Sequence, residues 1–195
     1  MVTTIEDLNV DIDFLYNDLI YSNNGSEEHY SKLFESLSRT KSNIRKIAKY
    51  NDWEYFCIFT IDENNADRYN YELLSQRIRY FLNNYKTRHS SNFKYVIVPS
   101  IHENGAIHFI GMISGATTIY KPEKISKNIN GEIEQVDNTP EYYVLPQYRL
   151  GHAFITKIRN KNKCGGLMMR RVNNFPFTKK GSRLLYASMG LNKKD

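Results

Sequence analysis

The sequence contains little cysteine and no long apolar run, and both absences exclude classes of protein. Its two cysteines, Cys57 and Cys164, are too few for a disulfide framework and lack the close spacing of zinc ligands. No apolar run reaches the roughly 18 residues that a membrane span needs, so no membrane partner is expected. The N-terminus is acidic, unlike a secretory signal peptide. These features predict a reduced, cytoplasmic setting.

Several sequence motifs are also absent. No glycine-rich loop is followed by Lys-Ser or Lys-Thr, so a P-loop nucleotide site is not expected. No internal repeat and no sustained heptad occurs, which argues against a solenoid or a coiled coil. The 195 residues suffice for one domain with a proper core.

The net charge of +6 hides a strong asymmetry along the chain. Residues 1–35 carry eight acidic residues and one lysine, whereas residues 152–195 carry eleven basic residues and one acid. Aromatic residues such as Phe175, Phe177 and Tyr186 are interleaved with this basic segment. That combination favours a polyanion such as nucleic acid as the partner.

The order of the expected elements predicts an α+β fold with a central antiparallel sheet of about five strands flanked by helices. Residues 1–25 end in "SNNGS" and are expected to form an acidic N-terminal arm, while residues 26–195 form a single domain. "HENG" is expected to form a tight turn between two antiparallel strands, because its Gly105 tolerates positive φ. "INGEI" carries the Asn-Gly signal of a second hairpin. Helical or strand periodicity gives these ranges: helices over 26–51, 67–88 and 162–174, and strands over 53–61, 93–100, 106–113, 151–158 and 182–188.

The stretch "AIHFIGMISG" reads as a strand on which His108 and Ile110 face the same side. Two imidazoles in those places would make a good start for a divalent metal site. Here the second place holds isoleucine, so the usual chemistry of such a pair is missing.

Several stretches in this order resemble the replication initiators of rolling-circle plasmids and phages, which belong to the HUH endonuclease superfamily. The matching text includes "KYVIVPSIHENGAIHFIGMISG" and "GHAFITKIRNKNKCGGLMMRRV", and the similarity covers roughly Ser38 to Leu191. The resemblance implies a fold that nicks one DNA strand: a tyrosine attacks the phosphodiester while two histidines and an acidic or polar residue hold Mn²⁺ or Mg²⁺.

This chain departs from the family pattern at each decisive place. Ser100 stands where a glutamate follows proline, and Ile110 stands where the second histidine should be, two residues after His108. The pattern Tyr-x-x-Lys-Tyr falls on Leu167 to Arg171, which contains neither tyrosine. We therefore expect no catalytic residues, no bound metal and no cofactor. His108 is then a structural histidine or a contact to phosphate or base.

The resulting hypothesis is a catalytically inactive nucleic-acid-binding protein of a phage or mobile element, acting by occupancy in the bacterial cytosol. The abundance of Asn, Tyr, Ile and Lys, typical of an AT-rich genome, fits such a source. One specific form is an anti-CRISPR inhibitor of an RNA-guided nuclease, its guide RNA or another host nucleoprotein complex. The expected nucleic-acid contacts, DNA or RNA, are Lys41, Arg45, Lys46, Lys49, Lys157, Arg159, Lys161, Lys163, Arg170, Arg171, Lys179, Lys180 and Arg183.

Two alternatives stay open at the level of sequence. One is an active nickase that uses Tyr186 or Tyr148 as nucleophile, with His102 and His108 as ligands and Mn²⁺ or Mg²⁺ as cofactor. In that case Glu103 or His152 could complete the ligand set of His102. The other alternative is a protein-interaction module in which the acidic arm docks on a basic partner.

Overall fold

The computed structural model of the chain describes residues 27–120, 127–129, 132–134, 142–175 and 183–193. The chain divides into two compact units, residues 1–38 and 39–195, and the fold described below is that of the second. The acidic arm predicted over residues 1–25 lies outside the described residues. Among the described helices, none has the length and apolar character needed to cross a membrane.

A five-stranded sheet forms the centre of the second unit, in the order β6-β1-β3-β2-β7 with every neighbouring pair antiparallel. This confirms the predicted α+β class and the antiparallel sheet. The middle strand, β3, is buried along its whole length, as expected for a strand covered on both faces. The strands of the sheet are β1 (Tyr55–Phe59), β2 (Lys94–Ile101), β3 (Ile107–Ser114), β6 (Ala153–Lys157) and β7 (Tyr186–Ala187).

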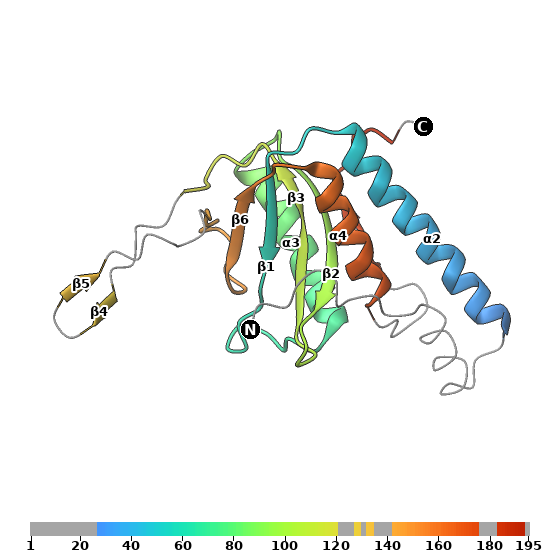
Figure 1. Cartoon of the computed structure of the whole chain (residues 1–195), viewed down its shortest axis with the longest axis horizontal. Coiled ribbons are helices and arrows are strands. Elements are labelled where there is room, and N and C mark those ends of the chain that lie inside the picture. Colours follow the sequence, from blue (N-terminus) through green and yellow to red (C-terminus); the bar gives the residue numbers. More distant parts are fainter. Residues whose placement is uncertain (1–26, 121–126, 130–131, 135–141, 176–182, 194–195) are drawn as a thin grey trace. The chain divides into compact units, whose positions relative to one another are not determined.

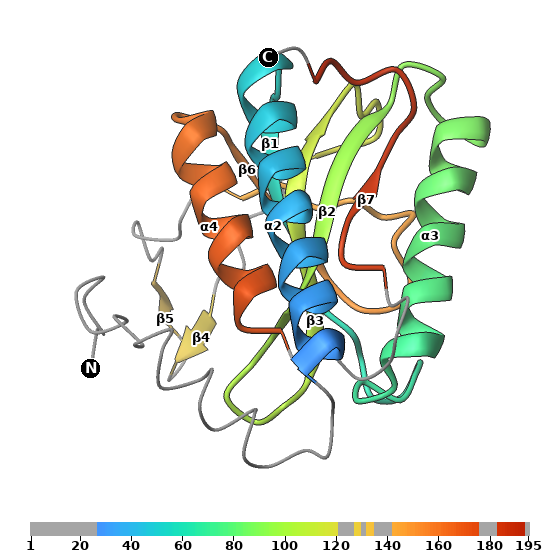
Figure 2. The same cartoon turned by 90° about the vertical axis from the view of Figure 1, so that its right-hand side faces the viewer.

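Helices cover the two faces of this sheet. Helix α3 (Tyr71–Arg88) packs on one face, where Phe81 meets Phe59 of β1 with ring centroids 5.7 Å apart. Helix α4 (Lys161–Asn173) contacts β2 and β3 from the other side. The part of α2 (Glu27–Tyr50) that begins at Arg39 lies next to α4, on the same side of the sheet (Figures 1 and 2).

Helix α3 begins four residues later than its periodicity predicted. The Asp67 carboxylate accepts a hydrogen bond from the backbone N–H of Tyr69 and holds a turn there, at 2.9 Å. Asn70 is the N-cap, and its side chain accepts from the N–H of Leu73 at 3.1 Å. The predicted start at Asp67 is therefore wrong, because local side-chain bonds compete with the first helical turn.

Two predicted hairpins are present. Between β2 and β3 the backbone N–H of His102 donates to the carbonyl of Ala106 at 2.9 Å, and Gly105 has φ of +81°. A second, two-stranded sheet pairs β4 (Lys127–Ile129) with β5 (Glu132–Glu134), on either side of the Asn-Gly pair, which itself lies outside the described residues.

The two glycines inside α4 differ in their surroundings, so substitutions at the two positions can be compared directly. A Cβ at Gly165 would lie 2.8 Å from the Cβ of Ala48 on α2, whereas a Cβ at Gly166 would meet nothing within 4 Å. We expect Gly165→Ala to destabilise the protein by about 1 kcal/mol or more. Gly166→Ala should stabilise it by up to about 1 kcal/mol through helix propensity. Thermal or denaturant unfolding measures both, and equal effects of the two changes would contradict this packing.

Candidate nucleic-acid interface

The positions at which the chain departs from the family pattern lie on the side of the sheet that α4 covers. Ser100 and His108 are direct cross-strand partners in β2 and β3. Ile110 follows on the same face, two residues along β3. Helix α4, which carries Leu167 and Arg171, packs on these two strands. The structure therefore places the four positions at which the chain departs from the initiators on one side of one sheet.

Four side chains define what we call the His108 cluster: Ser100, His102, His108 and Arg171. The imidazoles of His102 and His108 stack with centroids 4.0 Å apart and planes 30° apart. The Ser100 hydroxyl and the His108 Nδ1 are buried and have no hydrogen-bond partner among the described residues. Unpaired buried polar atoms are costly, so these two atoms leave unused hydrogen-bonding capacity inside the cluster.

The electrostatics of the cluster keep His108 neutral. Burial is the largest cause, and the electrostatic effects of His102 and Arg171 act in the same direction. Together they lower the pKa of His108 to about 4, although the backbone of Ala106 opposes the shift. At pH 7 the cluster thus presents a neutral imidazole next to the guanidinium of Arg171.

This lowered pKa predicts how stability responds to pH. In the unfolded chain His108 binds a proton below about pH 6.5, whereas in the folded protein it binds one only below about pH 4. Because the unfolded state binds more protons between these values, the free energy of unfolding falls as the pH falls through this window. We expect His108→Gln to lose less stability than wild type between pH 6.5 and 4, measured as unfolding midpoints across the range. The exposed His152→Gln is the control, and equal behaviour of the two variants would contradict the account.

The predicted basic residues of α4 have two roles. Arg170 and Arg171 are exposed in its last turn, where they also complement the helix dipole, and Lys163 is exposed in its first turn. Lys161 instead donates to the carbonyl of Asn51 at 3.1 Å. Lys41 of α2 donates to the Asn173 side chain at 3.0 Å. The last two lysines tie α4 to its neighbours and are less available to a ligand.

The remaining predicted contacts are dispersed. Lys157 is exposed at the end of β6, but it pairs with Tyr55 and so lies on the face of the sheet that α3 covers. Arg159 is exposed between β6 and α4, and Arg45 and Lys49 are exposed on α2. Lys46 is half-buried on the same helix. Arg183 lies on the other side of the sheet, where its carbonyl accepts from the Tyr71 hydroxyl of α3. Lys179 and Lys180 fall outside the described residues. The candidate interface that the structure brings together therefore consists of the His108 cluster, Arg159, Lys163 and Arg170, which we call the α4 basic surface.

Ile110 and Leu167 are packing residues in this structure. Ile110 is only 3% exposed and lies between its cross-strand partners Ile58 of β1 and Val98 of β2. Leu167 is half-buried on α4, next to the fully buried Met168. Apolar side chains thus fill the two places where the family resemblance implies a metal ligand and a nucleophile.

The tyrosines of the nickase alternative lie on the opposite face from His108. Tyr186 is buried, meets Phe109 edge-on and donates its hydroxyl to Ser75 of α3 at 2.6 Å. The Tyr148 hydroxyl donates to the carbonyl of Thr60 at 2.9 Å, and burial raises the pKa of this phenol. The structure does not bring either tyrosine together with His102 and His108, and this expectation of the nickase alternative is wrong.

One part of the candidate interface was not predicted from the sequence. Phe154 of β6 is 40% exposed on the same sheet face as Ile110, beside the half-buried Phe56 and Ile58 of β1. This strip is the part of the face nearest the β6 edge, whereas α4 contacts β2 and β3. The alternation in "AFITK" could have shown it, since Phe154 falls on the outward side of that strand.

Comparisons with known proteins give no match: no protein-family model, no curated protein and no solved structure is significantly similar to the chain. The resemblance to rolling-circle initiators therefore rests on the quoted motifs, and it stays a prediction. The function has to be argued from the site itself.

Proposed function

We propose that this protein is a non-catalytic nucleic-acid-binding protein, related in fold to the rolling-circle initiators, that acts by occupying its target. The observation that carries the proposal is the position of Arg171. Its charge acts on the neutral His108, at the place where the resemblance to initiators implies a metal ion. A guanidinium there provides positive charge without a metal.

The chemistry of a guanidinium explains why this substitution favours binding over cleavage. Arg presents a rigid fork of N–H donors that matches the oxygens of a phosphate, and it carries its charge at every physiological pH. It is not a nucleophile, and its charge repels a cation placed beside it. Position 171 can therefore attract the phosphodiester that an initiator would attack.

The surroundings of the cluster support the same partner. Lys163 lies exposed in the first turn of α4, where a cation is unfavourable for the helix dipole, so the helix itself gains nothing from it. On the other flank, Phe154 offers an exposed ring to a base. Lysines and arginines beside an exposed aromatic ring are typical of surfaces that track a nucleic-acid backbone.

The biological role that fits is inhibition by occupancy in the cytoplasm of a bacterial host. Such a protein, encoded by a phage or mobile element, would mask a nucleic acid or capture a host nucleoprotein complex, for example an RNA-guided nuclease or its guide RNA. The basic charge of the C-terminal part of the chain supports an anionic target of this kind.

The experiment that tests the proposal separates binding from covalent chemistry. The protein is incubated with labelled hairpin DNA, single-stranded DNA and single-stranded RNA in the presence of Mn²⁺. We expect complexes that dissociate at high salt. We expect no nicked product, and no protein–DNA adduct that survives denaturation. A covalent adduct would contradict the proposal, and so would failure to bind any of the three at low salt.

A single restored ligand provides a sharper version of this test. Ile110→His places an imidazole two residues from His108, but Ser100 and Leu167 remain without a carboxylate and a phenol. We expect no metal-dependent nicking by this variant, measured on the same labelled hairpin. The triple change Ser100→Glu, Ile110→His, Leu167→Tyr is the comparison in which all three missing groups return. Nicking by the single variant would show that other residues of the chain already complete the site.

A further inference from the structure

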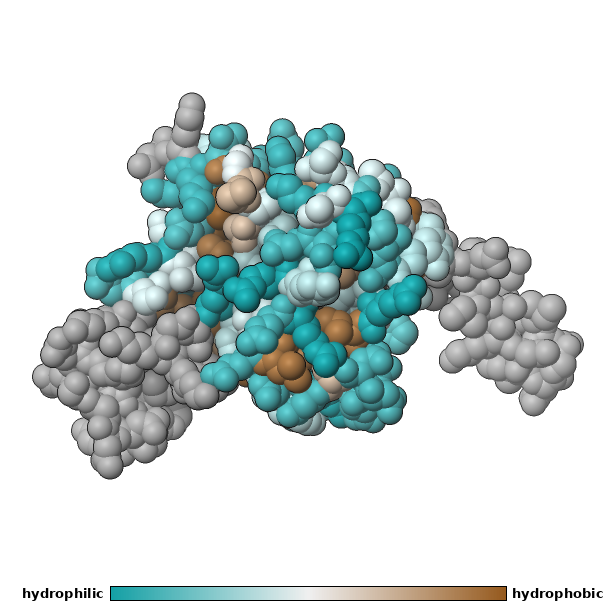
Figure 3. All heavy atoms as spheres, turned by 180° about the vertical axis from the view of Figure 1, so that it is seen from behind, coloured by the Kyte–Doolittle hydropathy of each residue, from teal (hydrophilic) through white to brown (hydrophobic). Residues whose placement is uncertain are grey.

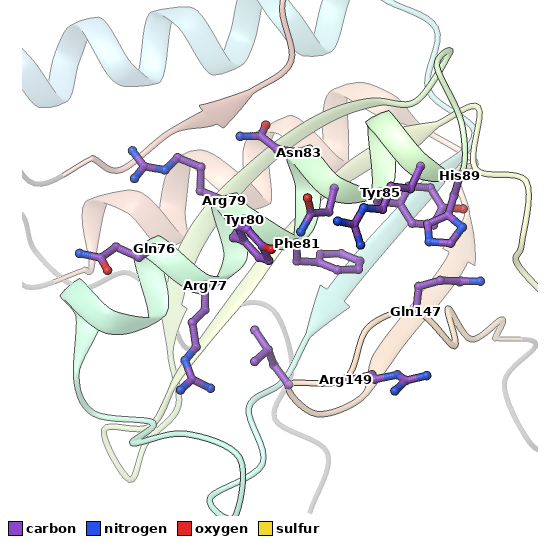
Figure 4. Close-up of a pocket in the computed structure, with 13 residues that line it drawn as sticks. Gln76, Arg77, Arg79, Tyr80, Phe81, Asn83, Tyr85, His89, Gln147 and Arg149 are labelled. Atoms are coloured by element: carbon purple, nitrogen blue, oxygen red, sulfur yellow. The ribbon is translucent and has the colours of Figure 1, made fainter.

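A second basic groove lies on the other side of the sheet, along the outer side of α3. It has a volume of about 760 Å³ and is lined by residues of α3 and of the segment 147–150 that precedes β6. Figure 4 shows the side chains that line it, on α3 and on the neighbouring segment with Gln147 and Arg149. This volume is within the range of about 300–1,000 Å³ that is usual for ligand sites. We call it the α3 groove.

The charge of the α3 groove is entirely positive. Arg77, Arg79, Arg88 and Arg149 line it, and none of the described residues that line it is acidic. Within the described part of the chain, Arg79, Arg88 and Arg149 form no ion pair, while Arg77 donates to the carbonyl of Asn65 at 2.8 Å. Like charges gathered without counter-charges destabilise a fold slightly, which indicates that an anion is their partner.

Aromatic side chains form the apolar part of the groove. Tyr80 is 68% exposed, so the face of its ring is available to stack with a ligand. Phe81 next to it is held in place by Phe59 and Tyr148, with centroids 5.7 and 5.0 Å away. Figure 3, which views this side of the molecule, shows hydrophobic spheres lying among strongly hydrophilic ones.

Amide side chains complete the lining. Asn83 accepts a hydrogen bond from the Tyr95 hydroxyl at 3.2 Å, and Gln147 accepts one from Thr118 at 2.7 Å. Because each amide is fixed through its oxygen, its NH₂ group remains to donate. Such donors suit the acceptor atoms on the edges of bases.

We propose that the α3 groove is a second nucleic-acid site, which binds a single-stranded segment with its phosphates on the arginines and a base stacked on Tyr80. The combination of positive charge, an exposed ring and amide donors favours single strands, whose bases are free to stack. The α4 basic surface lies on the opposite face of the sheet. The protein would thus hold two segments of nucleic acid at once. The groove is independent of the His108 cluster, so it goes beyond the proposed function.

The experiment compares matched pairs of variants in binding to fluorescein-labelled oligothymidylate and oligouridylate, followed by anisotropy. Arg79→Glu with Arg149→Glu removes groove charge, and Lys94→Glu with Lys193→Glu changes the net charge equally at exposed lysines outside the groove. Tyr80→Ala removes the ring, and Tyr69→Ala removes another exposed ring. Thermal unfolding confirms that each variant is folded.

We expect about tenfold weaker binding for the groove arginine pair and for Tyr80→Ala, and no more than about twofold for each control. Groove variants that behave like their controls would overturn this inference, and if changes in α4 still weakened binding the proposed function would survive. Weaker binding by the groove variants together with unchanged binding by the α4 variants would support the groove and contradict the role assigned to the α4 basic surface. Competition by polyglutamate, with no binding of either oligonucleotide, would also overturn the inference in favour of an acidic protein partner.

Discussion

Replacing Arg170 and Arg171 together with glutamate is expected to weaken nucleic-acid binding about hundredfold at moderate salt. Both side chains are exposed in the last turn of α4, and Arg171 acts electrostatically on His108. The change removes two cations and places two anions against the phosphate backbone, which costs several kcal/mol in comparable interfaces. Anisotropy of a labelled single strand measures the loss.

Two further variants identify the cause of that loss. Lys94→Glu with Lys193→Glu gives the same change in net charge away from α4 and should weaken binding far less. Arg170→Lys with Arg171→Lys keeps the charge but removes the forked donors, so an intermediate loss is expected. If the lysine control lost as much affinity as the α4 pair, net charge alone would explain the binding, and the interface assigned to α4 would be wrong.

Gly111→Ala is expected to have the largest effect on stability. A Cβ at this position of β3 would lie 2.0 Å from the carbonyl oxygen of Val96 on β2, and 2.8 Å from the Cα of Ile97. Backbone atoms cannot rotate away as a side chain can, so the two central strands would have to separate. We expect a loss of about 3 kcal/mol or more and a lower unfolding midpoint by about 10 °C. Thermal unfolding gives the value.

The control for this substitution is Gly166→Ala, which adds the same methyl group where nothing lies within 4 Å. It should keep or raise the unfolding midpoint. A Gly111→Ala protein that unfolds like wild type would mean that β2 and β3 are not as close at this point as the structure has them.

The sequence was sufficient for the local features of the fold. The alternation in β3 correctly placed His108 and Ile110 on one face, and "HENG" marked the hairpin that joins β2 to β3. These features depend on neighbouring residues, because side-chain direction in a strand follows a period of two and a tight turn needs a residue such as Gly105. The start of α3 was wrong because the Asp67 turn was not recognised.

The candidate site was only partly predictable, because it depends on contacts between distant segments. The sequence placed Arg171 in a basic helix, but only the packing of α4 on β2 and β3 brings its charge to His108. Tyr186 was expected in a short strand, and only its pairing with Ile97 of β2 shows that it points to the α3 side. Strand pairing of this kind is set by the tertiary fold and cannot be read from local patterns.

The α3 groove illustrates the same limit. Periodicity places Arg77 and Arg79 on the outer side of α3, where charged residues are common and carry no special meaning. The groove exists because the segment with Arg149 crosses beside that helix, and the sequence does not show this approach. The only local indication of the groove was Tyr80, an exposed aromatic residue on the otherwise polar outer side of α3.

The dependence of affinity on salt tests the central claim most directly. If the protein binds the phosphate backbone through the α4 basic surface, the logarithm of its affinity for a single strand falls linearly with the logarithm of salt concentration, by about 0.7 for each phosphate contacted. The Arg170→Glu, Arg171→Glu protein should show a shallower slope than wild type, by about two contacts. Affinity that does not change with salt, or an identical slope in the variant, would contradict the account.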